Sequence, residues 1–279
     1  MTSSTDPEEG QQPDEALKDQ ISPALDKKRN AFSELMSPKA KQTKQPRQHQ
    51  HIGKPSNPKD ARSGLLPYIL NPAKFSSDIV VQYNENAVLI RDAFPKATVH
   101  LLLLPRDATK WDLNPRDAFD DETFLAMVQK EAADALQLAA SELSRLISPY
   151  SQSCQARIAA MEDDEPPAEL PTGRDFLKDF KVGVHAHPSM NHLHIHIISR
   201  DMYSDRLKHQ KHYNSFNTDF FIPLGDFPLA KEDPRRQTSY QNANLKKDYK
   251  CWRCGQGFAN KFTALKAHLQ EEFRAWRKE

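Results

Sequence analysis

At 279 residues, the chain is long enough for one sizeable domain and a small one, but not for two large domains. Its formal charge of +1 is too small to indicate a partner, and three cysteines exclude a disulfide framework and fit a reducing compartment. No apolar stretch is long enough to span a bilayer and the N-terminus lacks a secretory signal, so we expect a soluble intracellular protein without a membrane partner.

Residues 1–58 are rich in Gln, Pro, Ser, Lys and Asp and poor in aromatic residues, which predicts a disordered tail. Acids dominate this tail up to Asp26, whereas Leu35 to Lys59 contains bases and no acid. Such a basic block is either a solvated tail or a flexible arm that meets phosphates or serves as a nuclear address. Both interpretations stay open.

Residues 59–228 predict one α+β domain, in which a long helix packs on a mostly antiparallel sheet. The strongest helix signal is the apolar face of residues 121–147, which recurs at helical spacing. The other expected elements are a short helix at 61–71, strands at 79–83, 87–91 and 98–104, and a loop at 148–172 that holds a free thiol, Cys154.

Three histidines alternate with large apolar residues in His192-Leu-His194-Ile-His196-Ile-Ile, which predicts a strand with the three imidazoles on one face. From the residues alone, this face is accidental, a metal site, or a site of phosphoryl transfer in which a neutral imidazole attacks phosphorus. The complete pattern resembles the histidine triad superfamily of nucleotidyl hydrolases and transferases. That resemblance assigns the role of nucleophile to His194.

Basic and aromatic residues follow the triad between Lys208 and Phe221. This mixture suits either a surface that stacks on bases and neutralises phosphates, or a loop that its aromatic residues hold in place. Taking the first interpretation, we expect four residues of this segment and one base of the C-terminal region to contact DNA. They are Lys208, Lys211, His212, Tyr213 and Lys266.

Residues 229–248 are polar and predict a linker to a small finger at 249–279. A Cys-x-x-Cys turn and an i, i+4 ligand pair on one helix are typical of a structural zinc site, and a segment this short could hardly fold without metal. The expected ligands of the single Zn²⁺ ion are Cys251, Cys254, His268 and Glu272. Glu271 or water remains an alternative for the fourth position, and an unmetallated cysteine pair for the whole.

Over roughly residues 60–279, the chain resembles the aprataxin family. The matching stretches are Ile90 to Pro105, Val184 to His196, Lys211 to Thr218 and the finger. The resemblance implies a nuclear enzyme that removes AMP from adenylated 5′-phosphate ends of nicked or double-stranded DNA. The reaction would run through a covalent His-AMP intermediate and release AMP and 5′-phosphate DNA, without a metal in the chemistry.

The same resemblance assigns roles to further residues. His192 and His196 would bind phosphate oxygens, and His185 would act as an acid toward the leaving group, unless it is simply a histidine of the fold. The remaining members of the expected nucleotide pocket are Lys96, His100, Ser189 and Asp92.

Two features depart from the pattern of animal aprataxins. We expect no forkhead-associated domain before the catalytic domain, and the Cys-Cys-His-Glu finger looks like that of the fungal branch. No aromatic residue stands just before Gly64 to wedge against the end base pair; Leu65, Leu66 and Tyr68 are the alternatives.

Two other functions remain open. A general histidine-triad hydrolase would act on small adenylates, and a non-catalytic zinc-finger adaptor would bind DNA without turning over a nucleotide. For the main interpretation, we expect a monomer.

Overall fold

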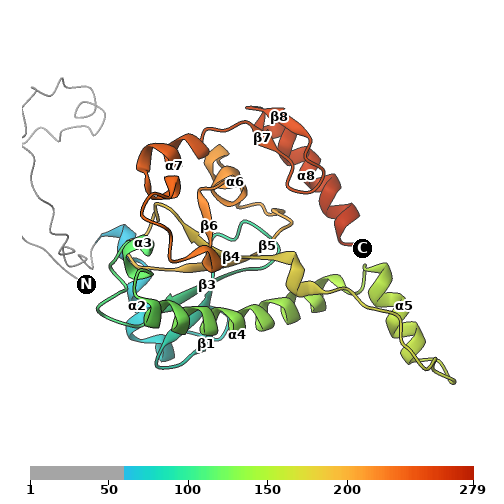
Figure 1. The fold of residues 1–279 in the computed structure, drawn as a ribbon. Coiled ribbons are helices and arrows are strands. Elements are labelled where there is room, and N and C mark those ends of the chain that lie inside the picture. Colours follow the sequence, from blue (N-terminus) through green and yellow to red (C-terminus); the bar gives the residue numbers. More distant parts are fainter. Residues whose placement is uncertain (1–59) are drawn as a thin grey trace, which may run out of the picture. The chain divides into compact units, whose positions relative to one another are not determined.

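The computed structural model describes residues 60–279, so the predicted tail at 1–58 lies outside the described residues. One antiparallel sheet lies at the centre of the described residues (Figure 1). Its strand order is β1-β2-β3-β5-β4-β6. The prediction of an α+β fold is confirmed. The strands are β1 (Val80–Tyr83), β2 (Ala87–Arg91), β3 (His100–Pro105), β4 (Phe180–His185), β5 (Ile195–Ser199) and β6 (Phe221–Pro223).

Helix α4 (Glu122–Ile147) runs along one face of this sheet, as Figure 1 shows. Asp121, the residue before its first turn, caps the helix: the Asp121 carboxylate accepts a hydrogen bond from the Phe124 amide at 3.1 Å. Its apolar stripe is buried against β3 and β5, which confirms the prediction of a long amphipathic helix.

Alternation along the strands decides which side chains face α4. Leu101 and Leu103 of β3 belong to the core under α4, whereas Leu102 and Leu104 belong to a cluster on the opposite face. Because successive residues of a strand point to opposite faces, His100 of β3 and His196 of β5 lie on the face away from α4.

Gly183 of β4 pairs with His196 of β5 at a place where β6 approaches closely. A Cβ atom at this position would lie 2.3 Å from the carbonyl oxygen of Ile222 and 2.8 Å from the Phe221 ring. The side chain of any other residue would therefore push β6 away from β4.

An N-terminal segment covers part of the sheet face opposite α4. Leu65 and Ile69 from this segment pack with Val88 and Ile90 of β2. Pro67 fits the start of a helix, since its missing amide falls in the first turn. The predicted single helix is three short turns: η1 (Ala61–Ser63), α2 (Leu66–Leu70) and η2 (Pro72–Lys74).

The predicted loop at 148–172 is partly wrong, because it contains helix α5 (Gln152–Met161). Ser151 caps this helix by accepting a hydrogen bond from the Cys154 amide at 3.3 Å. Cys154 is a free thiol, as expected, but it is buried in the core. The two other short elements of this part are α3 (Pro115–Ala118) and η3 (Phe176–Asp179).

The C-terminal part packs directly on the region of the six-stranded sheet. Leu265 and Leu269 share a buried cluster with Ile198 of β5 and with Tyr213 and Phe216. The predicted linker at 229–248 is also more regular than expected, because it contains a helix. The elements are α6 (Gln210–Asn217), η4 (Leu224–Asp226), η5 (Pro234–Arg236), α7 (Thr238–Asn244), β7 (Tyr249–Lys250), β8 (Gly257–Ala259) and α8 (Phe262–Trp276).

Among residues 60–279, no helix combines the length and the apolar character that a membrane crossing requires.

Candidate functional sites

A pocket of about 670 Å³ opens on the sheet face away from α4. Its walls come from four parts of the chain: the N-terminal segment, β2 with β3, the segment around the triad, and α6. The lining includes Gly64, Leu65, Tyr68, Ile90, Asp92, Lys96, His100, Leu102, His185, Ser189, Met190, His194, His196, His212 and Phe216.

The three histidines of the triad do not share one strand face. Strand β5 begins only at Ile195, because the Leu193 amide donates to the carbonyl oxygen of Trp111 at 2.6 Å. His192 is fully buried outside the pocket lining, and its Nε2 atom lies 3.4 Å from a carboxylate oxygen of Asp112. The expectation that His192 binds phosphate oxygens is therefore not supported by its position.

His194 lines the pocket and is held by the backbone. Its Nδ1 atom lies 2.8 Å from the carbonyl oxygen of His192, which can only accept a hydrogen bond. Nδ1 must therefore carry the proton, and Nε2 keeps its lone pair. Burial lowers the pKa of His194, so the ring is neutral at pH 7. A neutral, oriented imidazole is the form that attacks phosphorus.

A second chain of hydrogen bonds fixes His196. The Lys96 amide donates to Nδ1 of His100 at 3.2 Å, and a carboxylate oxygen of Asp92 lies 3.4 Å from the same nitrogen. With the amide as the donor to Nδ1, the proton of His100 sits on Nε2, which lies 3.0 Å from Nδ1 of His196. His196 must then carry its own proton on Nε2, a buried atom without a hydrogen-bond partner among the described residues. The pocket thus holds an N–H group that is free to donate.

Burial also keeps the neighbouring histidines neutral. It lowers the pKa of His100 to about 4 and that of His185 well below its ordinary value. The His185 ring lies 4.4 Å from that of His196, and its Nε2 atom is likewise buried without a partner among the described residues. Because His185 is neutral, it can donate a hydrogen bond but is a poor proton donor.

Lys96 and Asp92 line the pocket on the turn between β2 and β3. The Asp92 carboxylate accepts from the Phe94 amide at 2.7 Å, and the Lys96 ammonium donates to the Phe94 carbonyl oxygen. Burial lowers the pKa of Lys96. Both groups are therefore anchored by backbone atoms beside the histidines.

Ser189 is exposed at the rim of the pocket, and the N-terminal segment holds its loop in place. The guanidinium of Arg62 donates to the Ser189 carbonyl oxygen at 3.1 Å, and the Asn191 amide donates to the Arg62 carbonyl oxygen at 2.9 Å. Sequence reasoning missed Arg62 and Asn191, because only the fold brings positions so far apart in the chain into contact.

The ligand atoms of Asp92, His100 and His196 lie within 4.8 Å of one another, a spacing that could hold a metal ion. The nitrogen atoms that face each other, Nε2 of His100 and Nδ1 of His196, are already joined by a hydrogen bond. The remaining nitrogen of His100 accepts from the Lys96 amide. These contacts make the group a hydrogen-bond chain rather than an open ligand set.

The predicted DNA-binding residues differ in how far they are exposed to solvent. Lys208, Lys211 and Lys266 are exposed, and His212 is half-buried in the pocket wall. Tyr213 is a correction: its side chain is buried and cannot stack on a base. Its hydroxyl donates to the Lys250 carbonyl oxygen at 2.8 Å and accepts from the Trp252 amide at 2.9 Å.

A hollow of about 660 Å³ separates the loop before α6 from the start of α8. Lys208 and Lys261 line it from opposite sides, together with His209 and Phe262. Two ammonium groups at one hollow can neutralise a phosphate chain that passes through it.

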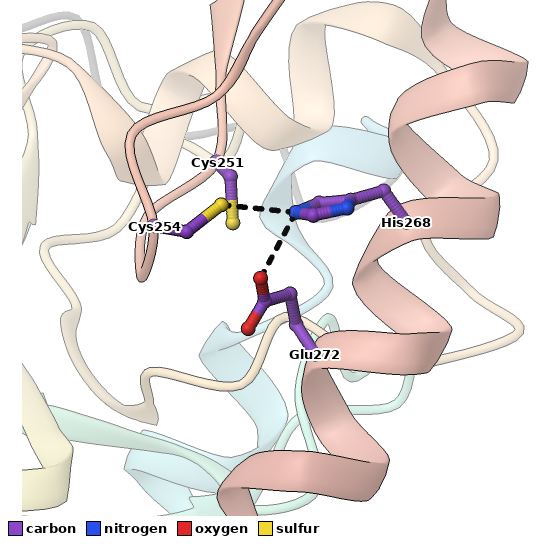
Figure 2. Close-up of side chains that lie close together, drawn as sticks. All are labelled: Cys251, Cys254, His268 and Glu272. Carbon is purple, nitrogen blue, oxygen red and sulfur yellow. Dashed lines mark hydrogen bonds and ion pairs between the residues drawn. The ribbon is translucent and has the colours of Figure 1, made fainter.

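Four potential metal ligands meet in the C-terminal finger, as Figure 2 shows. Cys251 and Cys254 lie on the turn after β7, and His268 and Glu272 lie one helical turn apart on α8. The turn ends at Gly255, whose φ of +75° favours glycine. The Nε2 atom of His268 lies 3.2 Å from the Cys254 sulfur and 3.1 Å from a Glu272 oxygen.

This cluster fits a zinc ion. All four donor atoms lie within 4.8 Å of one another, and two sulfurs, an imidazole nitrogen and a carboxylate oxygen are ligands that zinc accepts. The structure brings Glu272 to His268, whereas Glu271 is exposed and pairs with Arg274 at 2.8 Å. The geometry therefore favours Glu272 over Glu271 as the fourth ligand.

Comparisons with known proteins agree with this organisation. Residues 74–203 match the HIT domain family, and residues 217–275 match the C2HE / C2H2 / C2HC zinc-binding finger family. Fold and site therefore define a histidine-triad hydrolase that carries a zinc-binding finger at its C-terminal side.

Relatives narrow this class further. An aprataxin-like protein of Saccharomyces cerevisiae is 36% identical over 219 residues, which cover 77% of this chain and 96% of the relative. An aprataxin-like protein of Schizosaccharomyces pombe is 36% identical over 216 residues, with 77% and 82% covered. The chain belongs to the aprataxin-like proteins.

Solved structures of this family share the fold. The aprataxin ortholog Hnt3 in complex with DNA is 32% identical, has a TM-score of 0.60, and covers 78% of this chain and 96% of its own. Hnt3 in complex with DNA and guanosine is also 32% identical, has a TM-score of 0.61, and covers 78% of this chain and 97% of its own.

Proposed function

We propose that this protein removes AMP from adenylated 5′-phosphate ends of DNA. The observation that carries the proposal is the pair of oriented imidazoles in the pocket: His194 with a lone pair on Nε2, and His196 with a proton on Nε2. A nucleophile beside a hydrogen-bond donor is what transfer of a phosphoryl group requires.

In the first step, Nε2 of His194 would attack the phosphorus of AMP. A nitrogen–phosphorus bond forms, the bond to the bridging oxygen breaks, and that oxygen leaves with the DNA 5′-phosphate. The histidine then carries a positive charge, which the His192 carbonyl oxygen stabilises through Nδ1. His196 would donate to a non-bridging phosphate oxygen, where charge shifts in the transition state.

In the second step, water would attack the same phosphorus, the nitrogen–phosphorus bond to His194 would break, and AMP would leave, while one proton from that water would go to solvent. His185 would donate a hydrogen bond to the leaving oxygen rather than transfer a proton, since burial lowers its pKa. Lys96 would offset the charge of the phosphates at the rim. None of these steps uses a metal ion.

DNA would reach the pocket across the hollow between Lys208 and Lys261. Contacts from Lys208, Lys211 and Lys266 to the phosphate backbone would position the end without reading its sequence. Relatives that were solved in complex with DNA support DNA as the kind of substrate. We also propose that the protein acts as a monomer in the nucleus, which light scattering and fluorescence microscopy of a tagged chain would test.

A single-turnover assay with 5′-adenylated nicked DNA tests the proposal. We expect AMP release by the wild-type chain and its loss in His194→Ala. Release that persists in His194→Ala would contradict the role of His194. Cleavage of a small adenylate without competition from nicked duplex DNA would instead identify a general nucleotidyl hydrolase, and duplex binding without any release would identify an adaptor.

A further inference from the structure

Arg253 occupies the position just before the second cysteine of the finger, and its guanidinium joins two carboxylates. One terminal nitrogen, Nη1, lies 2.5 Å from Oε2 of Glu272, and the other, Nη2, pairs with Glu279. The side chain of Glu272 is only 11% exposed, so this contact is partly shielded from water. Arg253 therefore touches the predicted glutamate ligand without being a ligand itself.

The two oxygens of Glu272 have different partners. Oε1 lies 3.1 Å from Nε2 of His268, inside the group of four donor atoms that Figure 2 shows. Oε2 points out of that group, to Arg253. If zinc binds among the four donors, the contact with Arg253 leaves only Oε1 for the metal, and the carboxylate binds through one oxygen.

Charge gives Arg253 a second effect. Zinc with two thiolates, one neutral imidazole and one carboxylate carries a net negative charge, whereas a finger with two cysteines and two histidines is neutral. The guanidinium of Arg253 offsets that excess at hydrogen-bond distance. An arginine suits this position better than a lysine, because its planar fork can hold two carboxylates at once.

We propose that Arg253 is a positioning residue of the zinc site, which orients Glu272 as a ligand through one oxygen and neutralises the charge that glutamate brings. The pair with Glu279 fixes the guanidinium between the Cys-x-x-Cys turn and the chain beyond the end of α8. Partners of this kind hold metal ligands in place and raise the affinity of the site.

A neighbouring ion pair offers a matched control. Arg274 pairs with Glu271 at 2.8 Å on α8, the helix that also carries Glu272. Both side chains of this pair are exposed, and neither touches a donor atom of the cluster. Removing the charge of Arg274 alters the net charge of the finger as much as removing that of Arg253. Of these two arginines, only Arg253 contacts the ligand set.

The test is zinc competition with a chromogenic chelator on the zinc-loaded, full-length chain, and it needs neither DNA nor nucleotide. We expect Arg253→Gln to lower zinc affinity about tenfold to a hundredfold, as loss of a partner to a metal ligand does elsewhere. Arg253→Lys, which keeps the charge, should lose less, and Arg274→Gln should match the wild type. Equal affinity in all four proteins would overturn the proposal, and so would an equal loss in Arg253→Gln and Arg274→Gln.

The visible spectrum of the cobalt(II)-substituted protein separates geometry from charge at saturating metal. Arg253→Gln should change the d–d bands, because Glu272 is then free to bind through both oxygens, whereas Arg274→Gln should leave them as in the wild type. Identical spectra for Arg253→Gln and the wild type would overturn the orienting role. Arg253→Lys retains the charge, so its d–d bands can be compared with those of the wild type even if Arg253→Gln does not fold.

Discussion

The pocket and the finger both bring titratable side chains together, but the two regions fix the positions of these side chains in different ways. In the pocket, strand register and backbone carbonyls orient buried, neutral histidines, and each proton position follows from a hydrogen bond. In the finger, a short turn and one helix present four donor groups, of which Cys251 is buried and the others are at least partly exposed, and Arg253 faces one of them. Hydrogen bonds therefore hold the pocket histidines in place, whereas the four donors of the finger are arranged as a site for a metal ion.

Removing zinc should have the largest effect, and on the finger first. Structural zinc contributes on the order of 10 kcal/mol to the folding of small fingers, so Cys254→Ser should unfold this part and abolish DNA binding. Hydrolysis of a small adenylate should fall much less. Parallel assays of duplex binding and small-adenylate hydrolysis on wild type and Cys254→Ser would check this. An equal loss of both would contradict the separation between the two regions.

Breaking the hydrogen-bond chain of the pocket should come next. His100→Phe removes the donor to His196, so the N–H group facing the phosphate loses its fixed proton position. We expect AMP release to slow about 100-fold, the effect of losing one oriented donor. His100→Gln, whose amide can still donate, should retain more activity. Rates of AMP release should differ between the two variants, with the zinc content of each protein as the control. Equal rates would contradict the role of the His100–His196 hydrogen bond.

The buried histidines should also make stability depend on pH. The pKa of His100 is about 4 in the folded protein and about 6.5 in the unfolded chain, so its contribution to stability is complete above pH 6.5 and is lost as the pH falls toward 4. The loss for this residue is about 3 kcal/mol. Urea unfolding of the wild type between pH 7 and 4.5 should show a steeper decline than that of His100→Gln. Both proteins share the finger, so its own pH dependence cancels, and equal slopes would contradict the assignment.

A smaller effect should follow from adding a side chain at Gly183, the residue that pairs with His196. Gly183→Ala would place a Cβ atom 2.3 Å from the Ile222 carbonyl oxygen, which forces β6 to move and costs about 1–3 kcal/mol. Gly225→Ala is the matched control, since a Cβ atom there meets nothing within 4 Å. Chemical denaturation should separate the two variants. A Gly183→Ala protein as stable as Gly225→Ala would show that β6 yields freely.

A loss of similar size should come from the joint between the two regions. Tyr213→Phe removes the hydroxyl that binds the Lys250 carbonyl oxygen and the Trp252 amide. We expect a loss of about 1–3 kcal/mol in the free energy of unfolding, because two backbone groups lose a partner. Thermal unfolding of the variant would measure it. An unchanged midpoint would indicate that water replaces the hydroxyl.

Sequence patterns predicted the elements whose signal is local. The apolar stripe of α4, the Cys-x-x-Cys turn and the i, i+4 pair of His268 and Glu272 each depend on spacing within one element. The strand of the triad was predicted to begin at His192, but it begins at Ile195, because the Leu193 amide donates a backbone hydrogen bond to Trp111 instead of to a neighbouring strand.

Contacts between distant segments could not be predicted from the sequence. Tyr213 looked like a residue that stacks on bases, yet it is buried at the joint with the finger. Arg253 gave no signal, because its two carboxylate partners lie 19 and 26 residues away, on α8 and beyond its end. Such roles depend on packing between elements, which spacing alone does not encode.

Trapping the covalent intermediate would test the central claim most directly. DNA adenylated with AMP labelled at its phosphorus is mixed with excess wild-type protein and quenched in alkali, where a phosphorus–nitrogen bond of histidine survives. The account predicts label on the protein before free AMP accumulates, with the modified peptide mapping to His194. Release of AMP without labelled protein at any time, or label on another residue, would contradict it.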